Sequence, residues 1–151
     1  MSDETNTTFT PEQISQQARG NVAGLSLVAI AYLKEHALPM DEYWAFAGRR
    51  FAPNWEQEQG MSAKEVAYWA AISMVSGGCN LCSLSGDEVQ AKAVIEGWPP
   101  GNFLALFGLT QEEADTLFGV FENIAEHVGY DYEWHRQGNE VTMTFSRRSN
   151  E

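Results

Sequence analysis

The segment from residue 109 to residue 147 predicts a helix followed directly by a β-hairpin, and it constrains the fold more than any other part of the chain. Leu109-Thr110-Gln111-Glu112-Glu113-Ala114 has the pattern of a capping box, in which Thr110 and Glu113 satisfy each other's backbone amides. Apolar residues then recur every three or four positions up to Val128, and Gly129 is suited to end the helix.

The residues after Gly129 predict two strands with one apolar and one polar face. Aromatic residues alternate with polar ones before Gly138-Asn139, and apolar residues alternate with polar ones after it. A two-residue turn at Gly138-Asn139 would set the pairing of the strands. The expected inner pairs are Trp134 with Met143 and Tyr132 with Phe145, and the expected outer pairs are His135 with Thr142 and Glu133 with Thr144.

The N-terminal half predicts a long helix that begins at Thr10-Pro11. Thr10 is suited to the cap, and proline is tolerated at the first helical position because the amide there has no partner. Apolar residues at helical spacing form one face, which indicates either a central helix or a seam between two subunits. The residues of this face are Ile14, Ala18, Val22, Leu25, Val28, Ala29 and Tyr32.

Two more helices are expected, from Asp41 to about Phe51 and from the capping box at Ser62 to Gly77-Gly78. The apolar period then changes to two, which predicts a second hairpin over residues 80–95. The fold class predicted for the whole chain is α+β: a helical N-terminal half packed on a four-stranded antiparallel sheet, with a β-β-α-β-β C-terminal half.

The turn of this second hairpin is expected at Gly86-Asp87. A two-residue turn there would place Leu84 opposite Val89 and Cys82 opposite Ala91.

Length and charge restrict the possible functions. The 151 residues fit one domain, expected over residues 11–148 after a disordered tail of residues 1–10. A net charge of −12 would repel nucleic acid and anionic membranes. The longest apolar stretch, residues 22–33, is too short to cross a bilayer, and no signal peptide is visible. The prediction is a cytoplasmic protein with neither nucleic acid nor membrane as partner.

Cys79 and Cys82 form the motif that most suggests chemistry. A C-x-x-C pair binds zinc or cycles as a disulfide when a turn brings its sulfurs together. Residues three apart in a strand point to opposite faces, and no second pair supplies further ligands. We therefore expect free thiols, no metal and no cofactor. The alternative is that either cysteine is a nucleophile or metal ligand, assisted by His127 or His135.

Six residues are candidates for binding a small molecule. Arg49 and Arg50 could hold a carboxylate because a guanidinium binds one bidentately, although they also complement the C-terminal dipole of their helix. Aromatic side chains commonly line small-molecule pockets. The aromatic candidates are Trp98, Phe103, Phe107 and Trp134.

The order of elements resembles two groups of small bacterial domains. Helices lead through Gly78-Cys79 into a hairpin that ends at Gly97-Trp98-Pro99, and residues 109–113 open the final helix and hairpin. This layout resembles the L-2-amino-thiazoline-4-carboxylate hydrolase-like group and the 4-vinyl-reductase-type ligand-binding domains over about residues 14–147. The resemblance implies helices beside a hairpin-rich sheet. In the ligand-binding group a cysteine often lies in the final strands, whereas residues 141–145 here contain none.

The function predicted from these features is binding of a small organic molecule, as a sensor or carrier, in an apolar, aromatic-lined pocket between helices and sheet. Two alternatives stay open. One is a small hydrolase-like enzyme that uses Cys79 or Cys82, and the other is an interaction module that forms a homodimer.

Overall fold

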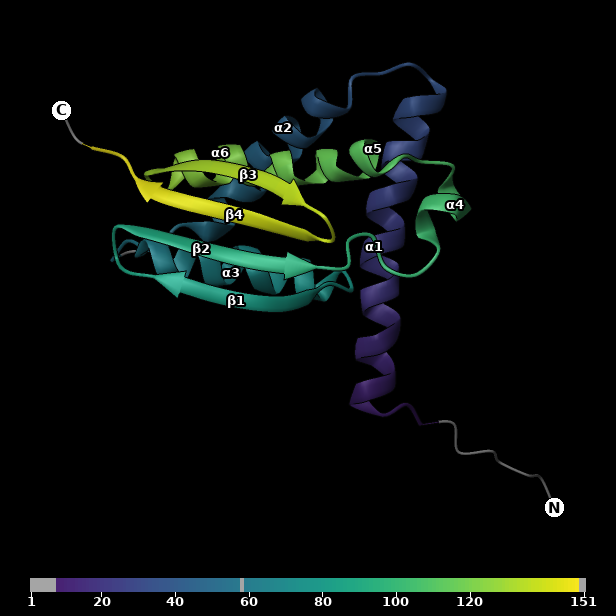
Figure 1. Cartoon of the computed structure of the whole chain (residues 1–151), viewed down its shortest axis with the longest axis horizontal. Coiled ribbons are helices and arrows are strands. Elements are labelled where there is room, and N and C mark those ends of the chain that lie inside the picture. The colour runs from purple at the N-terminus through teal and green to yellow at the C-terminus, as the bar shows by residue number, and fades with distance from the viewer. Residues whose placement is uncertain (1–7, 58, 150–151) are drawn as a thin grey trace.

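The computed structural model describes residues 8–57 and 59–149 and confirms the predicted α+β class (Figure 1). Three helices precede the first hairpin, and a broken helical segment separates it from the second. In chain order, the elements are α1 (Pro11–Glu35), α2 (Met40–Phe51), the 3-10 turn η1 (Ala52–Trp55), α3 (Ala63–Ser76), β1 (Asn80–Gly86), β2 (Gln90–Glu96), α4 (Phe103–Phe107), α5 (Gln111–Asp115), the 3-10 turn η2 (Thr116–Gly119), α6 (Val120–His127), β3 (Tyr130–Gln137) and β4 (Glu140–Arg147).

The four strands form one antiparallel sheet in the order β1-β2-β4-β3. Helices α3 and α6 pack on the same face of this sheet, and α2 packs on the outer side of α6 (Figure 1). Helix α1 crosses the end of the sheet at which β2 ends. The part of the chain that the structure describes contains no helix that is both long and apolar enough to cross a bilayer.

The second hairpin has the predicted register. Tyr132 pairs with Phe145 and Trp134 with Met143 on the face covered by the helices, while His135 pairs with Thr142 and Glu133 with Thr144 on the other face. The outer face is not uniformly exposed, because Thr144 is buried between its neighbours Lys92 and Glu133. The long stems of such charged side chains can cover a small residue between them.

The register predicted for the first hairpin is wrong by four residues, because Leu84 pairs with Ala93 instead of Val89. The turn is longer than two residues since the Asp87 carboxylate accepts hydrogen bonds from the backbone amides of Val89 and Gln90, at 2.8 and 3.0 Å. Cys82 also has no partner in the ladder, because a bulge falls between Leu81 and Ser83.

Of the two roles predicted for the apolar face of α1, a buried central face or a seam between subunits, the structure contradicts the first. Ile14, Leu25 and Tyr32 are between 57% and 71% exposed, whereas the buried residues of the helix lie on the opposite side. Those buried residues are Ala23, Leu27, Ile30 and Leu33. Both sides of α1 are apolar, so helical spacing alone does not identify which one faces the core.

The single helix predicted before Gly129 is divided into α5, η2 and α6. At the break, two side chains donate hydrogen bonds to backbone carbonyl groups. The Trp98 Nε1–H donates to the Ala114 carbonyl, and the Thr116 hydroxyl donates to the Glu113 carbonyl. These contacts accompany the change to 3-10 geometry. Helix α6 ends as predicted, with Gly129 at φ +91°.

Helices α2 and α6 approach each other closely at Gly48. A Cβ atom at this position would overlap the Val120 carbonyl oxygen, so a glycine is required here. The close approach places Phe51, at the C-terminal end of α2, beside α6, and the two helices share the wall of a pocket.

Candidate functional site

An apolar pocket of the described residues lies within the helical layer, among α1, α2, α3 and α6, and has a volume of about 290 Å³. None of its described lining residues belongs to a strand, so this pocket lies within the helical layer, whereas the pocket was predicted between helices and sheet. Its lining residues are Val22, Ser26, Trp44, Phe51, Trp55, Ser73, Met74, Gly77, Trp98, Leu117, Val120, Phe121 and Ile124.

Three tryptophans form much of this wall, and each is held by a specific contact. The Trp44 Nε1–H donates to the Thr116 hydroxyl at 3.2 Å, and the Trp98 Nε1–H donates to the Ala114 carbonyl at 3.0 Å. The Trp55 ring packs edge-on against Phe121. Because the indole N–H groups of Trp44 and Trp98 are already satisfied, these two rings offer the pocket only apolar surface.

The polar groups of the pocket are few and uncharged. The Ser26 hydroxyl donates to the Val22 carbonyl at 2.9 Å, and the Ser73 hydroxyl donates to the Trp69 carbonyl at 2.8 Å. Each oxygen keeps lone pairs that can accept a hydrogen bond. None of the described residues that line the pocket is charged. The arrangement therefore suits a neutral, mainly apolar molecule that carries at most one or two donor groups.

A buried ion pair holds the Trp98 segment in place. The Arg136 guanidinium binds the Asp115 carboxylate through Nε at 2.5 Å and through Nη2 at 2.8 Å, and Asp115 is only 4% exposed. The same Nη2 donates to the Trp98 carbonyl at 3.0 Å, as does the Gln111 side-chain amide. This network connects β3 and α5 to the loop that positions Trp98.

Of the six predicted ligand-binding residues, only Trp98 lines this pocket. Arg49 is exposed, and the Arg50 guanidinium lies over the Phe46 ring, 5.5 Å from its centroid. The predicted carboxylate anchor is therefore not at the pocket. Phe103 and Phe107 stack edge-to-face on each other within α4.

Trp134, the sixth predicted residue, lies elsewhere. Its ring packs against Phe118 and lines a separate hollow beside Asp41 and Glu112. These carboxylates make that hollow unlike the uncharged pocket of the helical layer.

Sequence reasoning missed two features of the pocket. Trp55 lies in the 3-10 turn after Pro53, where no hydrophobic period indicates burial. The pairing of Asp115 with Arg136 joins two charges 21 positions apart, and a charged residue alone gives no sign of its partner.

Cys79 is a buried thiol with low reactivity. It is 3% exposed, and burial raises its pKa to about 12, although the positive charge of Arg136 opposes this shift. A thiol must ionise to act as a nucleophile or a metal ligand. At neutral pH, Cys79 is therefore protonated.

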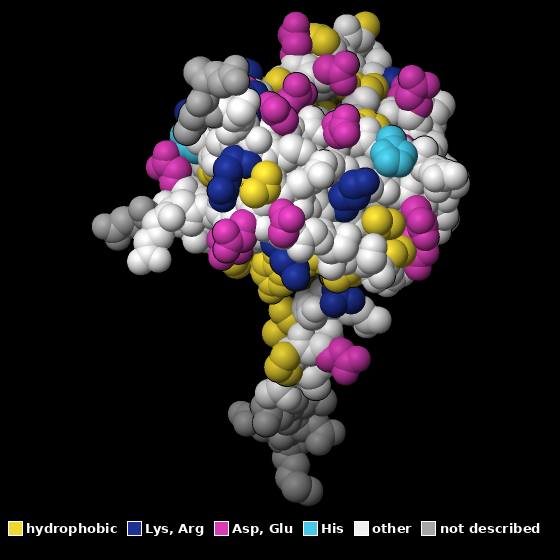
Figure 2. Space-filling view, turned by 60° about the vertical axis from the view of Figure 1, so that its left-hand side comes forward, with side chains coloured by type: hydrophobic (Ala, Val, Ile, Leu, Met, Phe, Trp, Pro, Cys, Tyr) yellow, Lys and Arg dark blue, Asp and Glu magenta, His cyan; other side chains and the backbone are white. Residues whose placement is uncertain are grey.

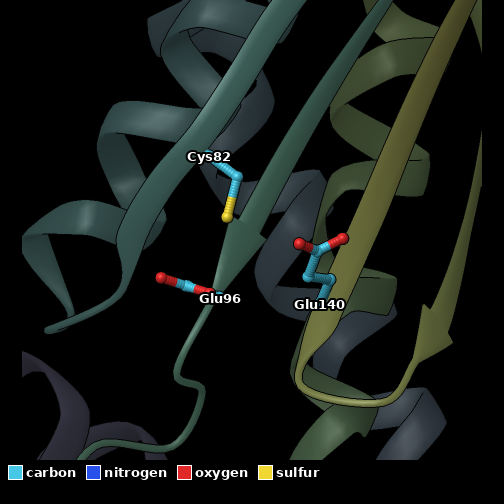
Figure 3. A group of neighbouring side chains, drawn as sticks. All are labelled: Cys82, Glu96 and Glu140. Carbon is cyan, nitrogen blue, oxygen red and sulfur yellow. The ribbon is translucent and has the colours of Figure 1, made fainter.

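Cys82 lies on the open face of the sheet, next to Glu96 and Glu140 (Figure 3). One ligand atom from each of the three residues lies within 4.8 Å of the others, so they could together hold a cation. Desolvation and the two carboxylates raise the pKa of Cys82 and disfavour its thiolate. Glu96 and Glu140 were not among the predicted site residues, and the bulge at Cys82 that turns its side chain toward them was not predicted.

The two histidines proposed as bases are engaged elsewhere. His127 Nε2 lies 2.6 Å from Glu56 Oε1 near the C-terminal end of α6. His135 is exposed on the outer face of the sheet, opposite Thr142. The charged groups that act on Cys82 are carboxylates and not a histidine. The predicted cysteine and histidine candidates do not assemble into a nucleophile and base pair.

The chain matches no model of a known protein family and no curated protein.

Proposed function

We propose that this protein binds a small, neutral, mainly apolar organic molecule in the pocket of its helical layer and acts as a sensor or carrier. The observation that carries the proposal is a pocket of about 290 Å³ lined by three tryptophans and two phenylalanines with no charged side chain. Small-molecule sites are typically concave and apolar with a few polar groups that set orientation. Ser26 and Ser73 are suited to that orienting role.

The chemistry of the wall favours a neutral ligand over an organic acid. A carboxylate would lose its hydration in the pocket without gaining a cationic partner, and burial of an unpaired charge is costly. The polar side chains available to hold a ligand are the hydroxyls of Ser26 and Ser73, since Arg49 and Arg50 lie outside the wall. The layout resemblance to 4-vinyl-reductase-type ligand-binding domains also implies a small-molecule ligand and stays a prediction.

The remaining expectations about partners and location also stay proposals. The net charge of −12 argues against nucleic acid as a partner, and a cytoplasmic location is the one expected from the sequence. A thiol nucleophile at Cys79 or Cys82 is disfavoured, because the pKa of both thiols is raised. The predicted homodimer concerns a different surface, the exposed side of α1.

Calorimetric titration with indole and with indole-3-carboxylate tests the proposed ligand class. The two probes share the same ring, and only the second carries a negative charge. We expect indole to bind and indole-3-carboxylate to bind at least about tenfold more weakly, because the pocket provides no cation to replace the lost water. Equal binding of the two probes, or no binding of indole, would contradict the proposal.

A pair of serine variants locates the binding site. Ser73 and Ser76 both lie on α3 and both donate to the carbonyl four residues earlier, but only Ser73 lines the pocket. In Ser73→Phe the added ring occupies pocket volume, and we expect a loss of indole affinity of about tenfold or more. Ser76→Phe is the matched control and should bind as the unmodified protein does. Loss of affinity in both variants, or in neither, would place the ligand elsewhere.

A further inference from the structure

Helix α1 presents an apolar side to solvent along its whole length. Ile14, Leu25 and Tyr32 are 57%, 71% and 57% exposed, and Val28 is 47% exposed. Figure 2 shows hydrophobic side chains along the part of the molecule that projects from the body. Single exposed apolar residues are ordinary, but a continuous stripe of them marks an interaction surface.

The stripe has the spacing of a coiled-coil seam. Its central positions follow one another at steps of four and three residues, which is the heptad spacing of two helices that pack side by side. These positions are Ile14, Ala18, Asn21, Leu25, Val28 and Tyr32. The flanking positions are uncharged and mostly small, which lets a second helix approach closely. They are Ser15, Gln17, Val22, Gly24, Ala29 and Ala31.

Three of the four charged residues of α1 lie away from this seam, and the fourth, Glu35, falls at its C-terminal end. At 3.6 residues per turn, Glu12, Arg19 and Lys34 fall on the side of the helix opposite Leu25, and Glu35 is its last residue. A solvent-facing side normally carries the charged residues of an amphipathic helix. In a chain with a net charge of −12, an uncharged seam allows a second copy to approach without direct repulsion.

The N-terminal part of α1 lacks support from its own fold. Every residue from 11 to 19 is exposed, and these turns extend beyond the sheet and the other helices (Figure 1). A helical segment this short is marginally stable in water when no other element packs on it. Packing of the seam against another helix would stabilise these turns.

We propose that two copies of this chain form a homodimer through the seams of their α1 helices. A twofold axis brings the same seam of each copy together, so each helix has a partner whose spacing matches. A helix of 25 residues is about 37 Å long and about 12 Å wide, and a third of its surface is about 500 Å². Two copies therefore bury about 1,000 Å² in total, which is the area at which a specific interface begins.

Molar mass in solution tests this dimer. At about 100 µM, which populates a dimer whose dissociation constant is micromolar, the mass of the wild-type protein should be about twice 16.8 kDa by sedimentation equilibrium. Leu25→Glu and Val28→Glu place a charge in the seam and should give the mass of one chain. Both side chains are largely exposed in the single chain, so their replacement should leave its core intact.

Val89→Glu is the matched control, because Val89 is 56% exposed in the turn of the first hairpin and far from the seam in sequence. It should retain the mass of the wild type. A monomeric wild type, or seam variants that keep the dimer mass, would overturn the proposal. A third result would also overturn it: the wild-type protein is a monomer that floats with neutral phosphatidylcholine vesicles, and Leu25→Glu does not float. The seam would then bind lipid and not a second copy of the chain. The binding of indole is measured separately, so failure of the dimer leaves the ligand proposal unaffected.

Discussion

Asp115→Ala is expected to lower the free energy of unfolding by about 3–5 kcal/mol, because it leaves the partly buried Arg136 guanidinium without its counterion. The side chains of Arg136 and Asp115 are 17% and 6% exposed, so water compensates little for the loss. The Trp98 carbonyl would also lose part of the network that orders it. Urea unfolding, followed by circular dichroism, measures the change.

Two controls separate the loss of this ion pair from a general effect of removing an aspartate. Asp131→Ala removes the partner of Arg148 from an exposed pair and should change stability little. Asp115→Ala combined with Arg136→Met removes the uncompensated charge and should recover part of the lost stability. Two results would show that loss of the Asp115–Arg136 ion pair is not the cause of the destabilisation. One is a double variant no more stable than Asp115→Ala, and the other is a loss of stability in Asp131→Ala as large as that in Asp115→Ala.

Phe145→Ala is expected to lower the free energy of unfolding by about 3–5 kcal/mol, the usual cost of removing a buried phenylalanine ring. Phe145 is 1% exposed on the covered face of β4, and its ring packs against that of Tyr132 at a centroid distance of 5.0 Å. Partial collapse of the cavity would place the loss at the lower end of this range. The free energy of unfolding in urea is again the measurement.

Thr144→Ala tests the face assignment at the neighbouring position. Thr144 is 6% exposed, but it faces the open side of the sheet between Lys92 and Glu133. We expect a loss of about 1 kcal/mol, since only a methyl and a hydroxyl group covered by flexible side chains are removed. A loss equal to or greater than that of Phe145→Ala would mean that the two faces of the sheet are reversed.

The second hairpin could be predicted from sequence because one local feature decides its register. Gly138-Asn139 is a two-residue turn, and the alternation on both sides agrees with it, so Trp134 and Met143 could only pair in one way. The first hairpin has no such agreement. The hydrogen bonds of Asp87 lengthen its turn, and the bulge at Cys82 changes the alternation, and neither follows from spacing alone.

The candidate site was predicted less well because it depends on tertiary contacts. Trp98 was among the expected residues, but Trp44 and Trp55 come to it from α2 and η1, and only the packing of α2 on α6 brings these elements together. Helix α1 has two apolar sides, so its sequence was compatible with a core helix and with a seam. The structure shows that the face identified by spacing is exposed, which rules out the core helix and leaves the seam as a proposal.

The most direct test of the proposed ligand pocket is to locate bound indole by nuclear Overhauser effects between its protons and those of the protein. We predict contacts with the Trp98 ring, the Met74 methyl group and the Val22 methyl groups, which line the pocket from a loop, α3 and α1. Contacts confined to residues outside the pocket, such as Leu25 or Tyr32 on the exposed side of α1, would contradict the proposed site.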